Sequence, residues 1–149
     1  MAEVEINKII IPVDFSSVTT KVVDYATGVA DKLGAHVIFF HVVNDFKGYE
    51  MMLVHPSFNQ MIEDLKKEST AKIEALVEDH KDLKEGAEGR IAVGDAVEEI
   101  IALAKAEKAD MIIIGTHGTK GLEKILMGST AEKVVKKAPC PVLTFNPLK

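Results

Sequence analysis

The sequence predicts an α/β domain in which a parallel β-sheet is covered by helices on both faces. Short apolar runs alternate with longer amphipathic stretches along the chain, and such alternation is typical of strands joined by crossover helices. The apolar runs are continuous, as expected for strands that are buried on both faces. The length of 149 residues suits one domain, so we predict a single domain over residues 1–149.

Five apolar or β-branched runs are the predicted strands. The first, Lys8–Val13 (KIIIPV), is rich in isoleucine, and the second follows at Ala35–Val43 (AHVIFFHVV). The third is short, Arg90–Val93 (RIAV), and the last two are Asp110–Gly115 (DMIIIG) and Pro141–Phe145 (PVLTF). All of them have the length of ordinary strands.

Four amphipathic stretches between these runs are the predicted helices. They are Ser16–Leu33, about Ser57–His80, 94–109 and 129–137. Gly34 stands where a glycine is expected at a helix C-terminus. Asp95, with Glu98 three residues later, forms a capping-box signature. Residues 44–56 (NDFKGYEMMLVHP) give no clear prediction.

The composition argues against several classes of protein. The formal net charge of −5 disfavours nucleic acid and anionic membranes as partners, because both bind basic surfaces. Cys140 is the only cysteine, so an internal disulfide and a cysteine zinc cluster are excluded. The acidic start MAEVEINK does not predict a signal peptide, and no apolar run approaches the ~18 residues of a membrane span. We therefore expect a cytoplasmic protein.

The ends of the predicted strands locate the candidate ligand site. In open parallel sheets, ligands bind beyond the carboxyl ends of the strands, where the winding reverses. The fourth strand runs directly into GTHGTKGLEKILMGST, in which Gly115 and Gly118 follow the strand and Gly128 precedes a helix. Glycine lets backbone N–H groups approach an anion and allows a positive φ, and a helix start adds unpaired N–H groups. With the hydroxyls of Ser129 and Thr130, this stretch predicts a phosphate-binding loop.

A purely structural interpretation of these residues stays open. Gly115 and Gly118 can form a tight turn, and Ser129 can be a helix N-cap. Two common nucleotide-binding motifs are missing. Lys120 is followed by Gly121 and not by Ser or Thr, so the P-loop pattern fails. The first turn, DFSSV, contains no glycine, so the dinucleotide pattern GxGxxG fails as well.

Together these segments resemble the universal stress protein family in its ATP-binding branch, over essentially the whole chain. The family signature G-x2-G-x9-G-[ST] is matched by Gly115, Gly118, Gly128 and Ser129 without a gap. The opening KIIIPVDFSS, the run FFHVV, the turn GDAVEEII and the final CPVLTF match further segments of the family. The resemblance implies an open, Rossmann-like, five-stranded parallel sheet in the order 3-2-1-4-5.

The resemblance also implies a site for ATP, ADP or AMP, with Mg²⁺ or Mn²⁺ as the companion cation. Pro12, Val13 and Asp14 would line the adenosine side, and Val42 would offer backbone atoms to the adenine edge. Asp14 would approach the ribose or the metal ion. The other implied site residues are Gly115, Thr116, His117 and Gly118 around the ribose and first phosphates, and Gly128, Ser129 and Thr130 around the outer phosphates.

Several histidines and one acid have competing interpretations. Asp14 can simply cap the first helix, the side chain of Val42 belongs to the core, and His117 is expected to be a loop residue and not a catalyst. The other histidines show no metal-ligand spacing and are interpreted as scattered; they are His36, His41, His55 and His80.

The favoured function is a nucleotide-binding regulatory or stress-response module. Catalysis ranks second, as a slow ATPase or phosphotransferase, because no general base with an orienting partner is evident near the phosphates. A flavodoxin-like electron carrier ranks third, since the candidate loops offer only Phe15, Phe46 and Tyr49 to a flavin ring. The apolar last strand is expected at a sheet edge, where family members often pair it across a two-fold axis. We therefore predict a homodimer through Val142–Phe145.

Overall fold

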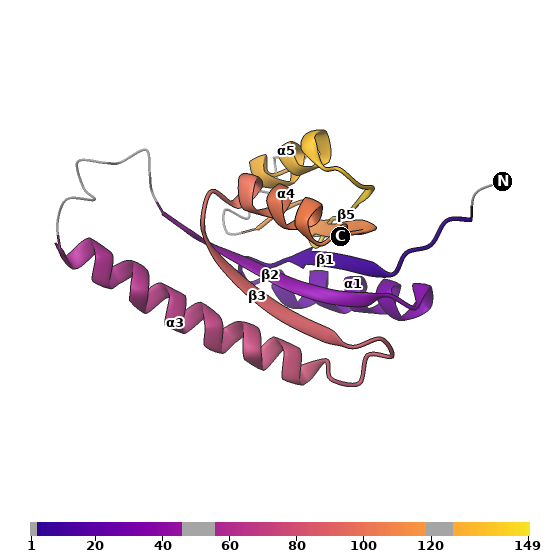
Figure 1. Ribbon diagram of the computed structural model, residues 1–149, viewed down its shortest axis with the longest axis horizontal. Helices are drawn as coiled ribbons and strands as arrows, with labels where there is room; N and C mark the ends of the chain where they lie inside the picture. Colours follow the sequence, from indigo (N-terminus) through magenta and orange to yellow (C-terminus); the bar gives the residue numbers. More distant parts are fainter. Residues whose placement is uncertain (1–2, 46–55, 119–126) are drawn as a thin grey trace.

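The chain folds into strands and helices that alternate along the sequence (Figure 1). The computed structural model describes residues 3–45, 56–118 and 127–149. Its elements are β1 (Lys8–Pro12), α1 (Thr19–Leu33), β2 (His36–Asn44), α3 (Pro56–Asp79), β3 (Ala87–Gly94), α4 (Ala96–Ala106), β4 (Met111–Gly115), α5 (Ser129–Lys137) and β5 (Val142–Phe145). The alternation predicted from the sequence is confirmed.

The strands form one five-stranded sheet in the order β3-β2-β1-β4-β5. Every neighbouring pair is parallel, so the predicted fold class and strand order are confirmed. The winding reverses between β1 and β4, which lie side by side although about 100 residues separate them, as in the pair Ile9↔Met111. In such sheets the crevice at the reversal is the usual place for a ligand.

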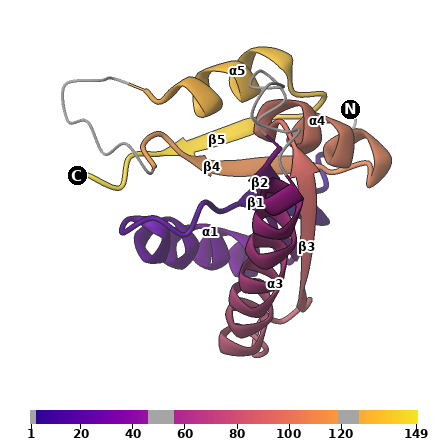
Figure 2. The same cartoon turned by 90° about the vertical axis from the view of Figure 1, so that its left-hand side faces the viewer.

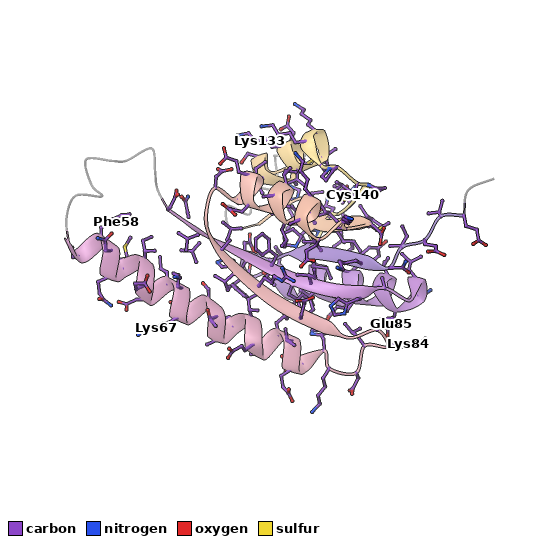
Figure 3. All side chains as sticks on the ribbon, viewed as in Figure 1. Phe58, Lys67, Lys84, Glu85, Lys133 and Cys140 are labelled. Atoms are coloured by element: carbon purple, nitrogen blue, oxygen red, sulfur yellow. The ribbon has the colours of Figure 1, made fainter. Side chains whose placement is uncertain are left out.

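Helices cover both faces of the sheet, as Figure 2 shows, with α1 and α3 on one side and α4 and α5 on the other. Alternate residues of the strands point to opposite faces, so Ile9, Ile11 and Phe39 lie in the core under α1 and α3. Ile10 and Ile38 lie in the second core, under α4 and α5. All five side chains are fully buried. Figure 3 shows side chains between the sheet and the helices on each of its faces. Burial on both faces explains why the strands read as unbroken apolar runs.

The third strand is longer than predicted, because it begins at Ala87 and not at Arg90. Its register with β2 runs from Val37↔Ala87 to Asn44↔Gly94. The added residues include Glu88, whose carboxylate accepts from His36 Nε2 at 3.0 Å. Charged side chains of this kind are common on an edge strand, and they hid the start of the strand from a search for apolar runs.

The first helix begins three residues later than predicted, at Thr19 instead of Ser16. The residues before it form a turn in which Phe15 has a left-handed φ of 58°. Two predicted helix signals are confirmed. Gly34 ends α1 with a φ of 67°, and Asp95 accepts a hydrogen bond from Glu98 N at 3.0 Å.

None of the helices in the described part of the chain combines the length and the hydropathy of a membrane-spanning segment.

Cys140 lies half-buried between α5 and β5 (Figure 3). Burial and, to a smaller extent, the nearby charge of Asp110 raise the pKa of the Cys140 thiol. The thiol therefore stays protonated at neutral pH, which makes it a poor nucleophile.

Candidate functional site

A cavity of about 250 Å³ lies at the carboxyl ends of β1 and β4, at the reversal of the winding. It is lined by strand ends and by the first turns of α1, α4 and α5. Every site residue proposed from the sequence borders it: Pro12, Val13, Asp14, Val42, Gly115, Thr116, His117, Gly118, Gly128, Ser129 and Thr130. Residues that are scattered along the sequence are thus brought together around one space.

The two ends of the glycine-rich stretch are joined by a direct hydrogen bond. Thr116 N, just after β4, donates to Phe145 O at 2.9 Å, which extends the ladder with β5. The carbonyl oxygen of Thr116 accepts a hydrogen bond from Gly128 N at 2.6 Å. A Cβ on Gly128 would lie 3.1 Å from that oxygen. This glycine therefore permits the close approach that brings the start of α5 next to the end of β4.

The reason for the glycines differs from the one expected, because none of Gly115, Gly118 and Gly128 has a left-handed φ. The requirement is space. A Cβ on Gly115 would lie 2.8 Å from a methyl group of Val22 on α1. A Cβ on Gly118 would overlap the Oδ2 atom of Asp14. The positive φ expected at these glycines is therefore wrong, and the glycines instead allow the loop to pack closely against α1 and the first turn.

Asp14 organises the turn between β1 and α1 but does not cap the helix. Its Oδ1 atom accepts from Ser16 N at 3.0 Å and from the Thr19 hydroxyl at 3.3 Å. The N-cap of α1 is Val18, which makes no side-chain capping bond. The helix-cap interpretation of Asp14 was therefore wrong. Among the described residues that line the cavity, Asp14 is the only acid.

The N-terminus of α5 faces the cavity. Ser129 is the first helical residue and Gly128 is the N-cap, without a side-chain capping bond. The first intrahelical bond runs from Glu132 N to Gly128 O at 3.0 Å, so the N–H groups of the first turn have no acceptor within the helix. The interpretation of Ser129 as an N-cap was wrong. Its side chain is exposed at the rim, beside these donors.

Two histidines border the cavity, and only one of them was predicted from the sequence. His117 is buried, with 8% of its surface exposed, and its Nδ1 lies 2.8 Å from the hydroxyl of Thr116. His41, interpreted as scattered, lines the same cavity, and its Nδ1 lies 2.7 Å from the carbonyl oxygen of Val13. Its place next to Val42, near the end of a strand, was the available signal.

The remaining histidines lie elsewhere or outside the description. His36 contacts Glu85 O at 2.9 Å and Glu88 at 3.0 Å. His80 contacts Leu76 O on its own helix at 2.8 Å. His55 lies outside the described residues, as do Lys120, Phe46 and Tyr49. Within the described ranges, no group of three or more His, Cys, Asp or Glu side chains is placed to hold a metal ion.

Apolar side chains make up much of the rest of the lining. They are Val18 and Val22 of the first turn and α1, Phe40 of β2, Ala96 and Ile100 of α4, Ile114 of β4 and Ala131 of α5. These side chains look like ordinary core residues in the sequence, so no pattern identified them as site residues. The lining thus combines apolar side chains with backbone N–H groups and hydroxyls.

Comparison with known proteins gives a consistent result. The profile of the universal stress protein family matches residues 5–146. The universal stress protein MJ0531 of Methanocaldococcus jannaschii is 33% identical over 146 residues, which cover 93% of this chain and 81% of that protein.

Two solved structures show the likeness in three dimensions. The structure of MJ0577, from the same organism, has a TM-score of 0.84 at 31% identity and covers 96% of this chain and 97% of that one. A universal stress protein family member from Arabidopsis thaliana, solved with AMP bound, has a TM-score of 0.67 at 20% identity and covers 94% and 91% of the two chains. At 20% identity, the likeness to the plant protein shows a shared fold alone.

Proposed function

The chain belongs to the universal stress protein family, and we propose that it is an ATP-binding regulatory member that serves a stress response. ATP would occupy the cavity at the strand ends, and its presence would change how the protein pairs with itself or with other proteins. The observation that carries this proposal is the mixed lining of the cavity, in which apolar side chains accompany hydroxyls and the first-turn N–H groups of α5. Such a lining suits a flat apolar base joined to a charged phosphate chain.

The expected roles of the residues follow the family resemblance and this lining. Adenosine would lie against apolar side chains and the first turn, with Pro12 and Val13 at its side and the backbone of Val42 at the adenine edge. The ribose and first phosphates would lie at Gly115–Gly118, and the outer phosphates at Gly128–Thr130. The volume of about 250 Å³ is just below the ~300–1,000 Å³ of typical ligand pockets. It would therefore enclose the nucleoside and leave the outer phosphates at the rim.

The cavity residues fit a nucleotide-bound Mg²⁺ or Mn²⁺ better than a metal held by protein alone. Asp14 offers one carboxylate, and Thr19, Ser129 and Thr130 offer hydroxyl oxygens. Mg²⁺ is usually bound through one or two carboxylates together with phosphate oxygens. Asp14 is thus the candidate protein ligand, and when bound the cation would neutralise phosphate charge. The AMP-bound plant relative gives independent support for a fold of this kind as an adenine-nucleotide binder.

Slow hydrolysis of ATP is the second candidate function, because His41 and His117 border the same cavity. We expect turnover far below the ~1–10³ s⁻¹ of ordinary enzymes. In the Ser–His–Asp triad a carboxylate orients the histidine and stabilises its charged form, whereas the described hydrogen bonds of these two histidines go to a backbone carbonyl and a hydroxyl. A steady-state phosphate-release assay tests this. Several turnovers per second, lost on changing His117, would establish an enzyme instead.

Replacing Ser129 by alanine tests where the phosphates lie. We expect ATP affinity to fall about tenfold, because a hydrogen bond to a charged group contributes about 1.5 kcal/mol at the lower end of its range. The lower end applies because Ser129 is exposed. The loss should be largest for ATP, smaller for ADP and smallest for AMP, since the proposed contact is to the outer phosphates.

Titration calorimetry with the three nucleotides measures this order. Thr70→Ala is the matched control, because it removes an exposed hydroxyl on α3 that does not line the cavity. An equal loss for all three nucleotides would contradict the proposed direction of the phosphates. Failure of the unchanged protein to bind any of them would contradict the proposed function itself.

A further inference from the structure

His41 lies in β2 directly after Phe40, the last residue paired with β1, and it contacts β1 where that strand leaves the sheet. The last backbone bond from β1 to β2 runs from Val13 N to Phe40 O at 2.8 Å. The carbonyl oxygen of Val13 lies 2.7 Å from Nδ1 of His41. A carbonyl only accepts, so Nδ1 carries a proton and donates. The side chain thereby continues the pairing of β1 with β2 beyond the last backbone bond.

The turn that follows Val13 has an unusual conformation. Phe15 has a φ of 58°, a region that bulky residues rarely enter and that persists only when the surroundings enforce it. The Phe15 ring lies 4.9 Å from the His41 ring, tilted by 46°. The Phe15 ring also contacts α3, where Lys72 Nζ lies 5.5 Å from the ring centre, within cation–π range. His41 therefore contacts both the carbonyl before the turn and the aromatic ring within it.

The turn after Val13 also fixes the position of Asp14 at the cavity. Asp14 lies between the two groups that His41 contacts, Val13 and Phe15. Its carboxylate fills the space where a Cβ of Gly118 would stand. A shift of the turn would therefore move this carboxylate against the glycine loop or away from it.

We propose that His41 is a positioning residue of this site, which holds the Val13–Ser16 turn so that Asp14 abuts Gly118. The proposal rests on the proposed nucleotide-binding function. His41 acts through the turn, by one hydrogen bond and one ring contact. His41 lines the cavity, but the contacts described for it are to the turn. Because such supporting contacts hold a site in its geometry, the loss of His41 should weaken binding through the turn.

Two substitutions separate the hydrogen bond from the ring. His41→Phe keeps an aromatic ring and removes the donor, and we expect ATP affinity to fall about two- to twelvefold, as for one lost internal hydrogen bond. His41→Asn keeps an N–H at the position of Nδ1, and we expect it to stay within about threefold of the unchanged protein. If ATP affinity is retained in His41→Asn, which has the N–H donor but no ring, the hydrogen bond positions the turn and simple packing of the ring does not explain the effect.

His80→Phe is the matched control. His80 also places Nδ1 2.8 Å from a carbonyl, that of Leu76, and its ring lies 5.4 Å from Phe39, but it does not line the cavity. Calorimetry with ATP should show no loss for His80→Phe, even if its melting temperature falls as much as that of His41→Phe. Equal losses in the two variants, or an unchanged affinity in His41→Phe, would overturn the proposal. If His41→Phe does not fold, a more than tenfold loss in His41→Asn would overturn it too.

A nuclear magnetic resonance readout keeps the inference testable without a nucleotide. The side-chain nitrogen spectrum should show a proton on Nδ1 of His41. The backbone amide of Gly118 should shift in His41→Phe and not in His80→Phe. If the unchanged protein binds no nucleotide, the proposed function fails, and this amide shift alone then decides whether His41 positions the turn. An unshifted Gly118 amide in His41→Phe would overturn it.

Discussion

Replacing Gly118 by valine is expected to weaken the proposed binding of ATP by about 150-fold, which corresponds to the upper end, ~3 kcal/mol, of the cost of overpacking. A Cβ at this position would overlap Oδ2 of Asp14. The carboxylate cannot simply turn aside, because its other oxygen accepts from Ser16 N and from the Thr19 hydroxyl. The branched side chain would therefore displace either the loop after β4 or the turn after β1, and both border the cavity.

Gly28→Val provides the control for this substitution. Gly28 lies exposed on α1, and a Cβ there would meet nothing within 4 Å. Valine has a better helix propensity than glycine, so this variant should fold and bind ATP like the unchanged protein. Circular dichroism checks the folding of both variants, and titration calorimetry gives the affinities.

The cause of the Gly118 effect can be isolated by a second substitution. If the clash with Asp14 is responsible, the loss in Gly118→Val should be smaller when Asp14 is already alanine, so the two changes should not add. Full additivity would mean that the clash with Asp14 is not the cause. A folded Gly118→Val variant with unchanged ATP affinity would mean that the glycine serves the turn alone.

The fold was largely predictable from the sequence, because its determinants are local. Continuous apolar runs mark strands that are covered on both faces, and the caps at Gly34 and Asp95 are read within a few residues. The start of β3 was missed because Glu88, which pairs with His36 and Arg90, lies on an edge strand, where apolar periodicity is weak. The pattern reports burial, and this stretch is only partly buried.

The site was predictable as a location, but its contacts were not. The signature glycines mark a loop, yet the reason for Gly118 is a carboxylate 104 positions earlier in the chain, which no local pattern shows. His41 was overlooked for a similar reason. A single histidine in an apolar strand has no spacing to identify it, and its role depends on the carbonyl of Val13 on the neighbouring strand. The apolar part of the cavity lining also comes from residues that resemble ordinary core residues in the sequence.

The outer edge of β5 is the second place where a large effect is expected, through self-association. β5 is the last strand of the sheet order, and no other described strand pairs with its outer edge. Such an edge offers its N–H and C=O groups to another chain. Next to it, Tyr25 stacks on Phe145 at 4.5 Å while remaining 42% exposed. Leu148 is also exposed. An apolar border to an open edge suits a second copy of the chain, so we propose a homodimer through Val142–Phe145.

The register of β5 shows which backbone groups are free for such pairing. Ile112 N donates to Pro141 O at 3.0 Å, and Thr116 N donates to Phe145 O at 2.9 Å. The bonds to β4 therefore use alternate residues of the strand, and Leu143 belongs to this inward set. The N–H of Thr144 points to the outer edge. A proline at Leu143 would damage the sheet itself, whereas a proline at Thr144 would remove only the outward donor.

Thr144→Pro is therefore expected to raise the dissociation constant of the dimer about 5- to 150-fold. In a dimer with two-fold symmetry, the substitution removes this N–H donor from both chains. Two hydrogen bonds of about 0.5–1.5 kcal/mol each are therefore lost. Thr144→Ala, which keeps the N–H and removes only an exposed hydroxyl and methyl group, should still dimerise. Light scattering over a micromolar concentration series measures the mass, and thermal melting confirms that both variants fold. A monomeric unchanged protein would contradict the predicted dimer, and a Thr144→Pro dimer as stable as the unchanged one would place the interface on a different surface.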